Sequence, residues 1–169
     1  MQKSTAVRCQ YRVTKYDPRF RDPTGAYTRD DWTAVSDIGR SFEGVVLTNG
    51  EYDRVETAYA STAVAMLAEA GVESLKVTGL EQHGNMGAPF DENAVVSLSN
   101  IAEVARSVLR QEYWCRLESP EAFVHFGWDY YMYVGIPKVP SLALAQAHER
   151  GLFVEVCESP YADHDGASA

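Results

Sequence analysis

Residues 113–134 read YWCRLESPEAFVHFGWDYYMYV, and this stretch decides the expected fold. Aromatic and apolar side chains dominate both of its halves, and Ser119-Pro120-Glu121 lies between them. Runs of this composition favour strands, and a proline among polar residues favours the turn that joins them. The stretch therefore predicts two neighbouring strands, residues 113–118 and 123–134, that pair across a hairpin.

Further strands and helices are expected on both sides of this pair. Period-two alternation and short apolar runs predict strands over residues 7–14, 42–47, 74–80 and 153–158. Apolar residues at three-and-four spacing predict three helices, which begin near Thr48, Asn100 and Ser141. Gly71 and Gly151 occupy positions typical of the glycine that ends a helix.

These elements alternate without a strict βαβ rhythm and without a repeat. We therefore expect an α+β fold, with a single mixed or mostly antiparallel sheet and about three helices packed on one of its faces. The length of 169 residues suits one domain. We expect this domain to span residues 1–161, and the small and polar residues 162–169 to form a disordered tail.

Composition and charge exclude several classes of protein. Hydrophobic residues make up 46% of the chain, which is far above the content of a disordered protein. The net charge is −9, and a surface of that sign repels phosphate, so nucleic acid is a disfavoured partner. The acidity is uneven. Residues 1–50 hold eight bases and six acids, a balance of +2, whereas residues 51–169 hold seven bases and eighteen acids, a balance of −11.

The sequence gives no sign of a membrane segment, a cofactor or a metal site. The first residues lack the apolar run of a signal peptide, and no apolar stretch approaches the roughly 20 residues that span a bilayer, so we expect a cytoplasmic protein without a membrane partner. Cys9, Cys115 and Cys157 are far apart and set among strand residues, which is typical of core thiols. There is no GxGxxG, Walker lysine loop, HExxH or GxSxG. We expect no cofactor and no bound metal.

The candidate site comes from the strand predicted over residues 123–134. If residues 124–134 form one strand, one face carries Val124, Phe126, Trp128, Tyr130, Met132 and Val134, and this face is expected in the core. The other face carries His125, Gly127, Asp129, Tyr131 and Tyr133, with successive residues about 7 Å apart along the strand. Trp114, Arg116 and Glu118 of the paired strand could lie on the same side, and together these side chains would make a patch able to hold a polar or aromatic ligand.

Three interpretations of this patch remain open. In the first, the patch is a solvated sheet face, where tyrosine is favoured in any case. In the second, the patch is a binding surface, because clustered Tyr, Trp and Arg are typical of interface hot spots. In the third, the patch is a catalytic site, with His125 as general base oriented by Asp129.

Two segments carry a resemblance. Residues 16–39, from Tyr16-Asp17-Pro18 to Asp37-Ile38-Gly39, and residues 124–133 resemble small uncharacterised bacterial proteins that are grouped loosely with toxin-immunity proteins. The resemblance implies a bacterial cytosolic protein that binds and neutralises a toxin. It assigns no catalytic residue.

The leading hypothesis from the sequence is a non-enzymatic binding protein of the immunity type. Its acidic surface and the patch of Trp114, Arg116, His125, Asp129, Tyr131 and Tyr133 would dock a basic protein partner, such as a toxin or nuclease. The alternative is a small-molecule-binding protein or an enzyme that uses the same patch as a pocket, beneath mobile loops 17–31 and 82–93. A third possibility, single-stranded RNA stacked on the tyrosines, needs a basic groove that only the N-terminal arginines could supply.

Overall fold

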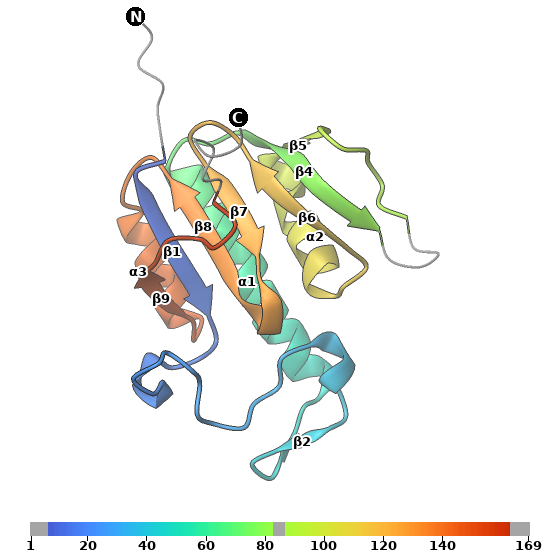
Figure 1. Ribbon diagram of the computed structural model, residues 1–169, viewed down its shortest axis with the longest axis vertical. Helices are drawn as coiled ribbons and strands as arrows, with labels where there is room; N and C mark the ends of the chain where they lie inside the picture. Colours follow the sequence, from blue (N-terminus) through green and yellow to red (C-terminus); the bar gives the residue numbers. More distant parts are fainter. Residues whose placement is uncertain (1–6, 83–86, 163–169) are drawn as a thin grey trace, which may run out of the picture.

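A computed structural model describes residues 7–82 and 87–162. Within these residues, seven strands form one sheet and three helices pack on it (Figure 1). The strands of this sheet are β1 (Cys9–Thr14), β4 (Ser74–Gln82), β5 (Val95–Ser97), β6 (Tyr113–Glu118), β7 (Phe123–Phe126), β8 (Met132–Ile136) and β9 (Phe153–Val156). The helices are α1 (Asn49–Glu69), α2 (Leu98–Leu109) and α3 (Ser141–Glu149).

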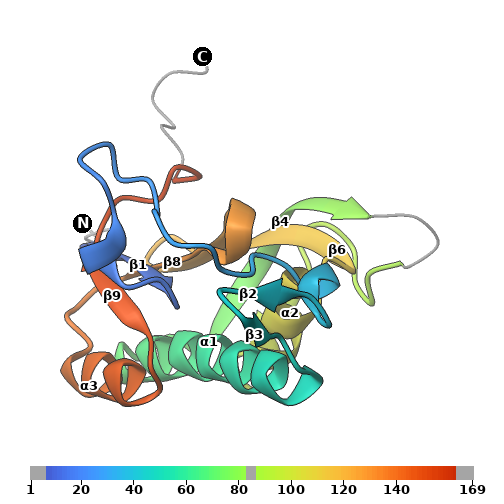
Figure 2. The ribbon, with the colours of Figure 1, turned by 90° about the horizontal axis from the view of Figure 1, so that it is seen from below.

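The sheet has the order β5-β4-β6-β7-β8-β1-β9, and each neighbouring pair runs antiparallel. The three helices lie together on one face of the sheet, as the view from below in Figure 2 shows. The expected α+β fold, with one mostly antiparallel sheet and three helices on one face, is therefore confirmed.

Helix α1 shows how local sequence shapes the helical layer. The Thr48 hydroxyl accepts a hydrogen bond from the backbone N–H of Glu51 at 3.1 Å, which caps the N-terminus as expected. Gly71 follows the helix with a φ of +77°, a conformation that glycine adopts at little cost. The predicted apolar stripe is buried, and includes Tyr52, Val55, Tyr59, Ala63 and Met66. Helix α2 begins earlier than expected, because Ser97 and not Asn100 precedes its first turn.

Three acidic side chains serve this architecture directly. Glu56 is 1% exposed and accepts hydrogen bonds from Arg110 and Arg106, which joins α1 to α2. The Glu69 carboxylate accepts from the backbone N–H groups at the start of α3, and Glu92 accepts from the backbone of β4. Part of the acidity after residue 50 is therefore structural, because Glu56 is a buried charge that must be paired, and Glu69 and Glu92 accept hydrogen bonds from the backbone.

Irregular segments cover the sheet face opposite the helices. Residues 157–162 leave β9 and cross β1 and β8 toward β7 (Figure 1). Residues 15–34 cover the lower end of the same face, where Arg21 Nη1 donates a hydrogen bond to the Tyr131 hydroxyl at 2.6 Å. Both segments matter for the candidate site, because they decide which side chains of this face meet solvent.

The strand expected over residues 42–47 is wrong. This region forms a small separate hairpin, in which β2 (Ser41–Phe42) pairs with β3 (Val45–Val46). Glu43 and Gly44, at the tip, have φ angles of 49° and 83°. Two successive residues with positive φ make the type of two-residue turn that matches strand twist, and this turn divides the apolar run.

The single strand expected over residues 123–134 is also wrong. It is divided into β7 and β8, which pair antiparallel with His125 opposite Tyr133 and Phe126 opposite Met132. A short 3₁₀ turn, Trp128–Tyr130, reverses the chain between them. The pairing of β6 with β7 across residues 119–122 is as expected, with Leu117 opposite Val124.

Candidate functional site

The turn between β7 and β8 has an uncommon backbone. Asp129 and Tyr130 have φ angles of 59° and 67°, in the left-handed region that favours glycine. Two such residues in succession are costly, so tertiary contacts must hold them. The Tyr16 hydroxyl donates a hydrogen bond to the Asp129 carbonyl at 2.6 Å. The Tyr130 ring packs 4.9 Å from Trp32 and 4.8 Å from Tyr59, measured between ring centroids.

A buried lysine supports the residues that hold this turn. Lys15 Nζ lies 4.3 Å from the ring centroid of Tyr16 and 4.1 Å from that of Trp32, and it pairs with Asp31 at 2.8 Å. Burial lowers the pKa of the Lys15 amine to about 8. Cation–π contacts and the ion pair together fix Tyr16 and Trp32 against the turn.

The turn places two aromatic neighbours in opposite environments. Tyr130 is 4% exposed, and its burial raises the pKa of its hydroxyl. Trp128 is 86% exposed. The burial of Tyr130 gives the strained turn a role in folding, whereas the exposed Trp128 side chain adds little to it, and backbone strain is common at functional positions. Trp128 is therefore the first candidate for a contact residue.

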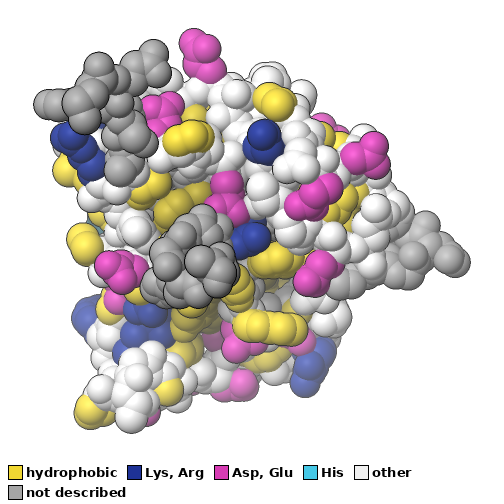
Figure 3. Space-filling model, turned by 45° about the horizontal axis from the view of Figure 1, so that its top comes forward, with side chains coloured by type: hydrophobic (Ala, Val, Ile, Leu, Met, Phe, Trp, Pro, Cys, Tyr) yellow, Lys and Arg dark blue, Asp and Glu magenta, His cyan; other side chains and the backbone are white. Residues whose placement is uncertain are grey.

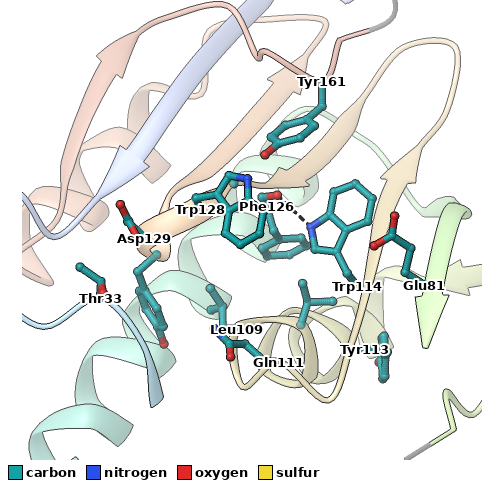
Figure 4. A pocket seen from close by; sticks show the side chains of 13 residues that line it. Thr33, Glu81, Leu109, Gln111, Tyr113, Trp114, Phe126, Trp128, Asp129 and Tyr161 are labelled. Atoms are coloured by element: carbon teal, nitrogen blue, oxygen red, sulfur yellow. Dashed lines mark hydrogen bonds between the residues drawn. The ribbon is translucent and has the colours of Figure 1, made fainter. Parts of the chain in front are cut away.

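Trp128 stands beside a cleft of about 550 Å³, which we name the aromatic cleft (Figure 4). It opens between the end of α2, the start of β6, the β7–β8 turn and the C-terminal segment. Six aromatic side chains line it, namely Tyr113, Trp114, Phe126, Trp128, Tyr130 and Tyr161. The Trp114 Nε1–H donates to the Phe126 carbonyl at 3.0 Å, which fixes one wall of the cleft. The Trp114 and Tyr161 rings lie 5.7 Å apart.

Charge at the aromatic cleft is acidic. Glu81 and Asp129 belong to its lining, and they lie on opposite sides of the tryptophans in Figure 4. The described lining residues include no lysine or arginine. A group that enters the aromatic cleft therefore meets π faces and two carboxylates.

The structure brings only two of the sequence-predicted site residues to this cleft. Trp114 and Asp129 line it, whereas Arg116, His125, Tyr131 and Tyr133 lie elsewhere on the sheet face. We name Arg116, Glu118, His125 and Tyr133 the polar row. They occupy neighbouring strands on the face opposite the helices, which is the side that the alternation predicts.

His125 of the polar row is fully buried. Its ring stacks on Phe123 at 4.0 Å, Nδ1 lies 2.7 Å from the Ser159 hydroxyl, and Nε2 lies 3.6 Å from Glu118. The expected orientation of His125 by Asp129 is wrong, because the turn places Asp129 in solvent beyond the end of β7. With these contacts and no exposed surface, His125 is held as a structural group and not as an accessible base.

The other members of the predicted patch are also engaged. Arg116 Nε lies 3.3 Å from Glu118, and Tyr133 is only 7% exposed. The Tyr161 ring lies 6.4 Å from that of Tyr133. The Tyr131 hydroxyl accepts the hydrogen bond from Arg21. The N-terminal loop and the C-terminal segment thus cover the part of the predicted patch that lies outside the cleft, at Tyr131 and at His125.

Thiols and potential metal ligands give no second site among residues 7–82 and 87–162. Cys115 is buried, and burial raises the pKa of its thiol to about 12, whereas Cys9 and Cys157 are partly exposed. No three His, Cys, Asp or Glu side chains of this part of the chain converge to hold a metal ion. No helix there has the length and hydrophobicity to cross a membrane. The predicted tail, from residue 163 onward, and residues 83–86 of the predicted loop lie outside the described residues.

Comparison with known proteins assigns no function, so any functional proposal depends on the geometry of the site. No family model matches the chain, and no curated protein or solved structure is similar enough to show a relationship. The resemblance to toxin-immunity proteins therefore stays a prediction from the sequence.

Sequence reasoning missed the main residue of the cleft. It placed Trp128 on the core face of a continuous strand, where five of the six assigned residues are indeed buried. The available signal was Gly127 before and Asp129 after the tryptophan, because glycine and aspartate favour turns. Glu81 and Tyr161 carried no comparable signal, since their place depends on how β4 and the C-terminal segment pack.

Proposed function

We propose that this protein is a non-enzymatic, cytosolic binding protein of the immunity type, which docks a basic protein partner at the aromatic cleft. The single observation that carries the proposal is Trp128, held 86% exposed by a strained turn at the edge of this cleft. Tryptophan is strongly enriched among residues that dominate binding energy.

The surroundings of Trp128 support a protein contact. Trp114 and Tyr161 extend the aromatic surface inward from the exposed indole. Interface hot spots cluster in this way around a pocket that becomes dry on binding. Val139 and Leu142, at 58% and 63% exposed, belong to other elements and do not line the cleft.

Charge supports a basic partner. The net charge is −9, and Figure 3 shows acidic side chains spread over one face among apolar, uncharged and some basic ones. A distributed field of this sign raises the association rate of a basic protein and is screened by salt. Glu81 and Asp129 place two of these charges at the cleft itself.

A small-molecule ligand is the second candidate, and the cleft volume favours it. About 550 Å³ lies within the roughly 300–1,000 Å³ typical of ligand pockets. The site would be the aromatic cleft, because the patch around His125 that the sequence suggested as a pocket is covered. No catalytic step is derived for it.

The test is affinity capture from a lysate of the source organism at low and high salt, with Trp128→Ala and Val139→Ala as matched baits. Both residues are exposed, so both variants are expected to fold. We expect a basic protein to be captured at low salt by the wild type and by Val139→Ala, and to be lost with Trp128→Ala. Equal capture by all three baits would contradict the proposal. A different result would favour the small-molecule ligand. In that case no protein is captured, and a small molecule raises the melting temperature of the wild type in thermal-shift assays but not that of Trp128→Ala.

A further inference from the structure

Three separate elements contribute aromatic rings to the lining of the aromatic cleft. Trp128 comes from the β7–β8 turn, Trp114 from β6 and Tyr161 from the C-terminal segment. Figure 4 shows these rings around a common space. The Trp114 and Tyr161 planes are inclined by 54°, so they do not close on each other as a stacked pair does. Ring faces that are left open attract cations through their quadrupole.

Within residues 7–82 and 87–162, the two carboxylates of the cleft have no partner in the fold. Glu81 and Asp129 side chains make no ion pair or hydrogen bond with any other described residue, whereas Glu56, Glu69 and Glu92 all hold parts of the fold together. The hydrogen bond from the Tyr16 hydroxyl goes to the backbone carbonyl of Asp129 and leaves its carboxylate uninvolved. Two free negative charges beside ring faces favour a positively charged occupant over a neutral one.

We propose that the group entering the aromatic cleft is an arginine guanidinium of the partner. The planar cation stacks on an indole face while its N–H groups donate to Glu81 or Asp129 at the sides. A lysine ammonium fits less well, because it is a compact, strongly hydrated charge and cannot stack as a plane. This inference rests on the proposed function, since it names the side chain by which the basic partner docks.

The probe for this inference is N-acetyl-arginine amide, titrated into the ¹⁵N-labelled full chain at low salt. The readout is the indole N–H resonances of the tryptophans. We expect the Trp114 and Trp128 signals to shift and that of Trp32 to stay, because Trp32 is 6% exposed and lies in the core. N-acetyl-citrulline amide has nearly the same shape without the charge and should cause no comparable shift. N-acetyl-lysine amide should bind more weakly than the arginine probe.

Variants assign the contacts. Trp128→Ala should weaken the arginine probe by about fivefold or more. Glu81→Gln and Asp129→Asn should each weaken it by about two- to fivefold, and asparagine keeps the left-handed backbone accessible at position 129. Glu103→Gln, an exposed substitution on α2 outside the cleft, should leave the titration unchanged.

Each outcome separates this inference from the proposed function. Equal binding of citrulline or lysine amide, or the absence of any shift with arginine amide, would overturn the guanidinium assignment. If protein capture still depends on Trp128 in that case, the proposed function stands with another anchor. If the arginine probe binds as expected while capture is unaffected by Trp128→Ala, the guanidinium site is supported and the proposed function is refuted.

Discussion

The polar row and the aromatic cleft are neighbours, because the Tyr161 ring lines the cleft and lies 6.4 Å from that of Tyr133, yet they differ in what their side chains do. In the polar row, His125 is fully buried and contacts Ser159, Glu118 and the ring of Phe123. At the cleft, Trp128 is 86% exposed and stands on a strained turn. The comparison teaches that residue type alone does not identify a site. Engaged polar groups stabilise the fold, and groups kept exposed at a cost are the candidates for binding.

The largest loss of stability should come from a substitution that displaces the Phe123 ring beneath the polar row. Gly135 pairs with Phe123, and a Cβ at position 135 would lie 2.6 Å from Phe123 Cζ. Gly135→Ala must therefore displace the ring that stacks on His125. We expect it to lower the free energy of unfolding by about 3 kcal/mol, measured by chemical denaturation.

Gly50→Ala is the matched control for this change. A Cβ at position 50 meets Thr48 Oγ only at 4.0 Å, and the site is in the first turn of α1. We expect a change of less than about 1 kcal/mol, toward greater stability, since alanine is the better helix former. A Gly135→Ala protein as stable as wild type would show that the polar row is loosely packed, which would weaken the comparison.

His125→Ala should have the second largest effect, also on stability. The substitution removes a fully buried ring and its hydrogen bond with the Ser159 hydroxyl. We expect a loss of about 2 kcal/mol in the free energy of unfolding, with partner capture unchanged at a temperature where the variant is folded. His148→Ala, at an exposed position of α3, serves as control. A variant of normal stability that fails to capture the partner would make the polar row, and not the cleft, the functional region.

Acid should weaken the polar row through Glu118. Interaction with His125, and with Thr78 and Arg116, holds the pKa of this carboxyl below its ordinary value of 4.5. The stabilisation is therefore complete above pH 4.5 and is lost as the pH falls through the lowered pKa. Glu118→Gln removes the titration, so the stability difference between wild type and variant, roughly 1 kcal/mol near neutral pH, should shrink below pH 4.5. A difference that is constant from pH 7 to pH 3 would show that Glu118 has no such role.

The smallest effect on stability should be that of Trp128→Ala. The side chain is exposed, so truncation should change the free energy of unfolding by no more than about 0.5 kcal/mol. Thermal and chemical denaturation measure this directly, alongside the capture experiment. A loss above about 1 kcal/mol would mean that the indole is structural, and the distinction between the two regions would fail.

The sequence by itself determined the fold class and most element positions. Thr48 caps α1, Gly71 and Gly151 end α1 and α3 with positive φ, and the three-and-four spacing of α1 matches its buried stripe. Period-two alternation placed the polar row on one face of the sheet. These features depend on contacts within a few residues, which composition and spacing reveal directly.

Only the tertiary structure decided which of the candidate residues meet solvent. The backbone of Asp129 is held by Tyr16, which is 113 residues earlier in the chain, and Tyr130 is held by Trp32 and Tyr59. The same long-range packing turns Trp128 outward, while the segment that follows β9 buries His125. Alternation in the sequence shows which face of a strand a side chain occupies. Whether that side chain is buried depends on which segments, distant in the sequence, pack on that face.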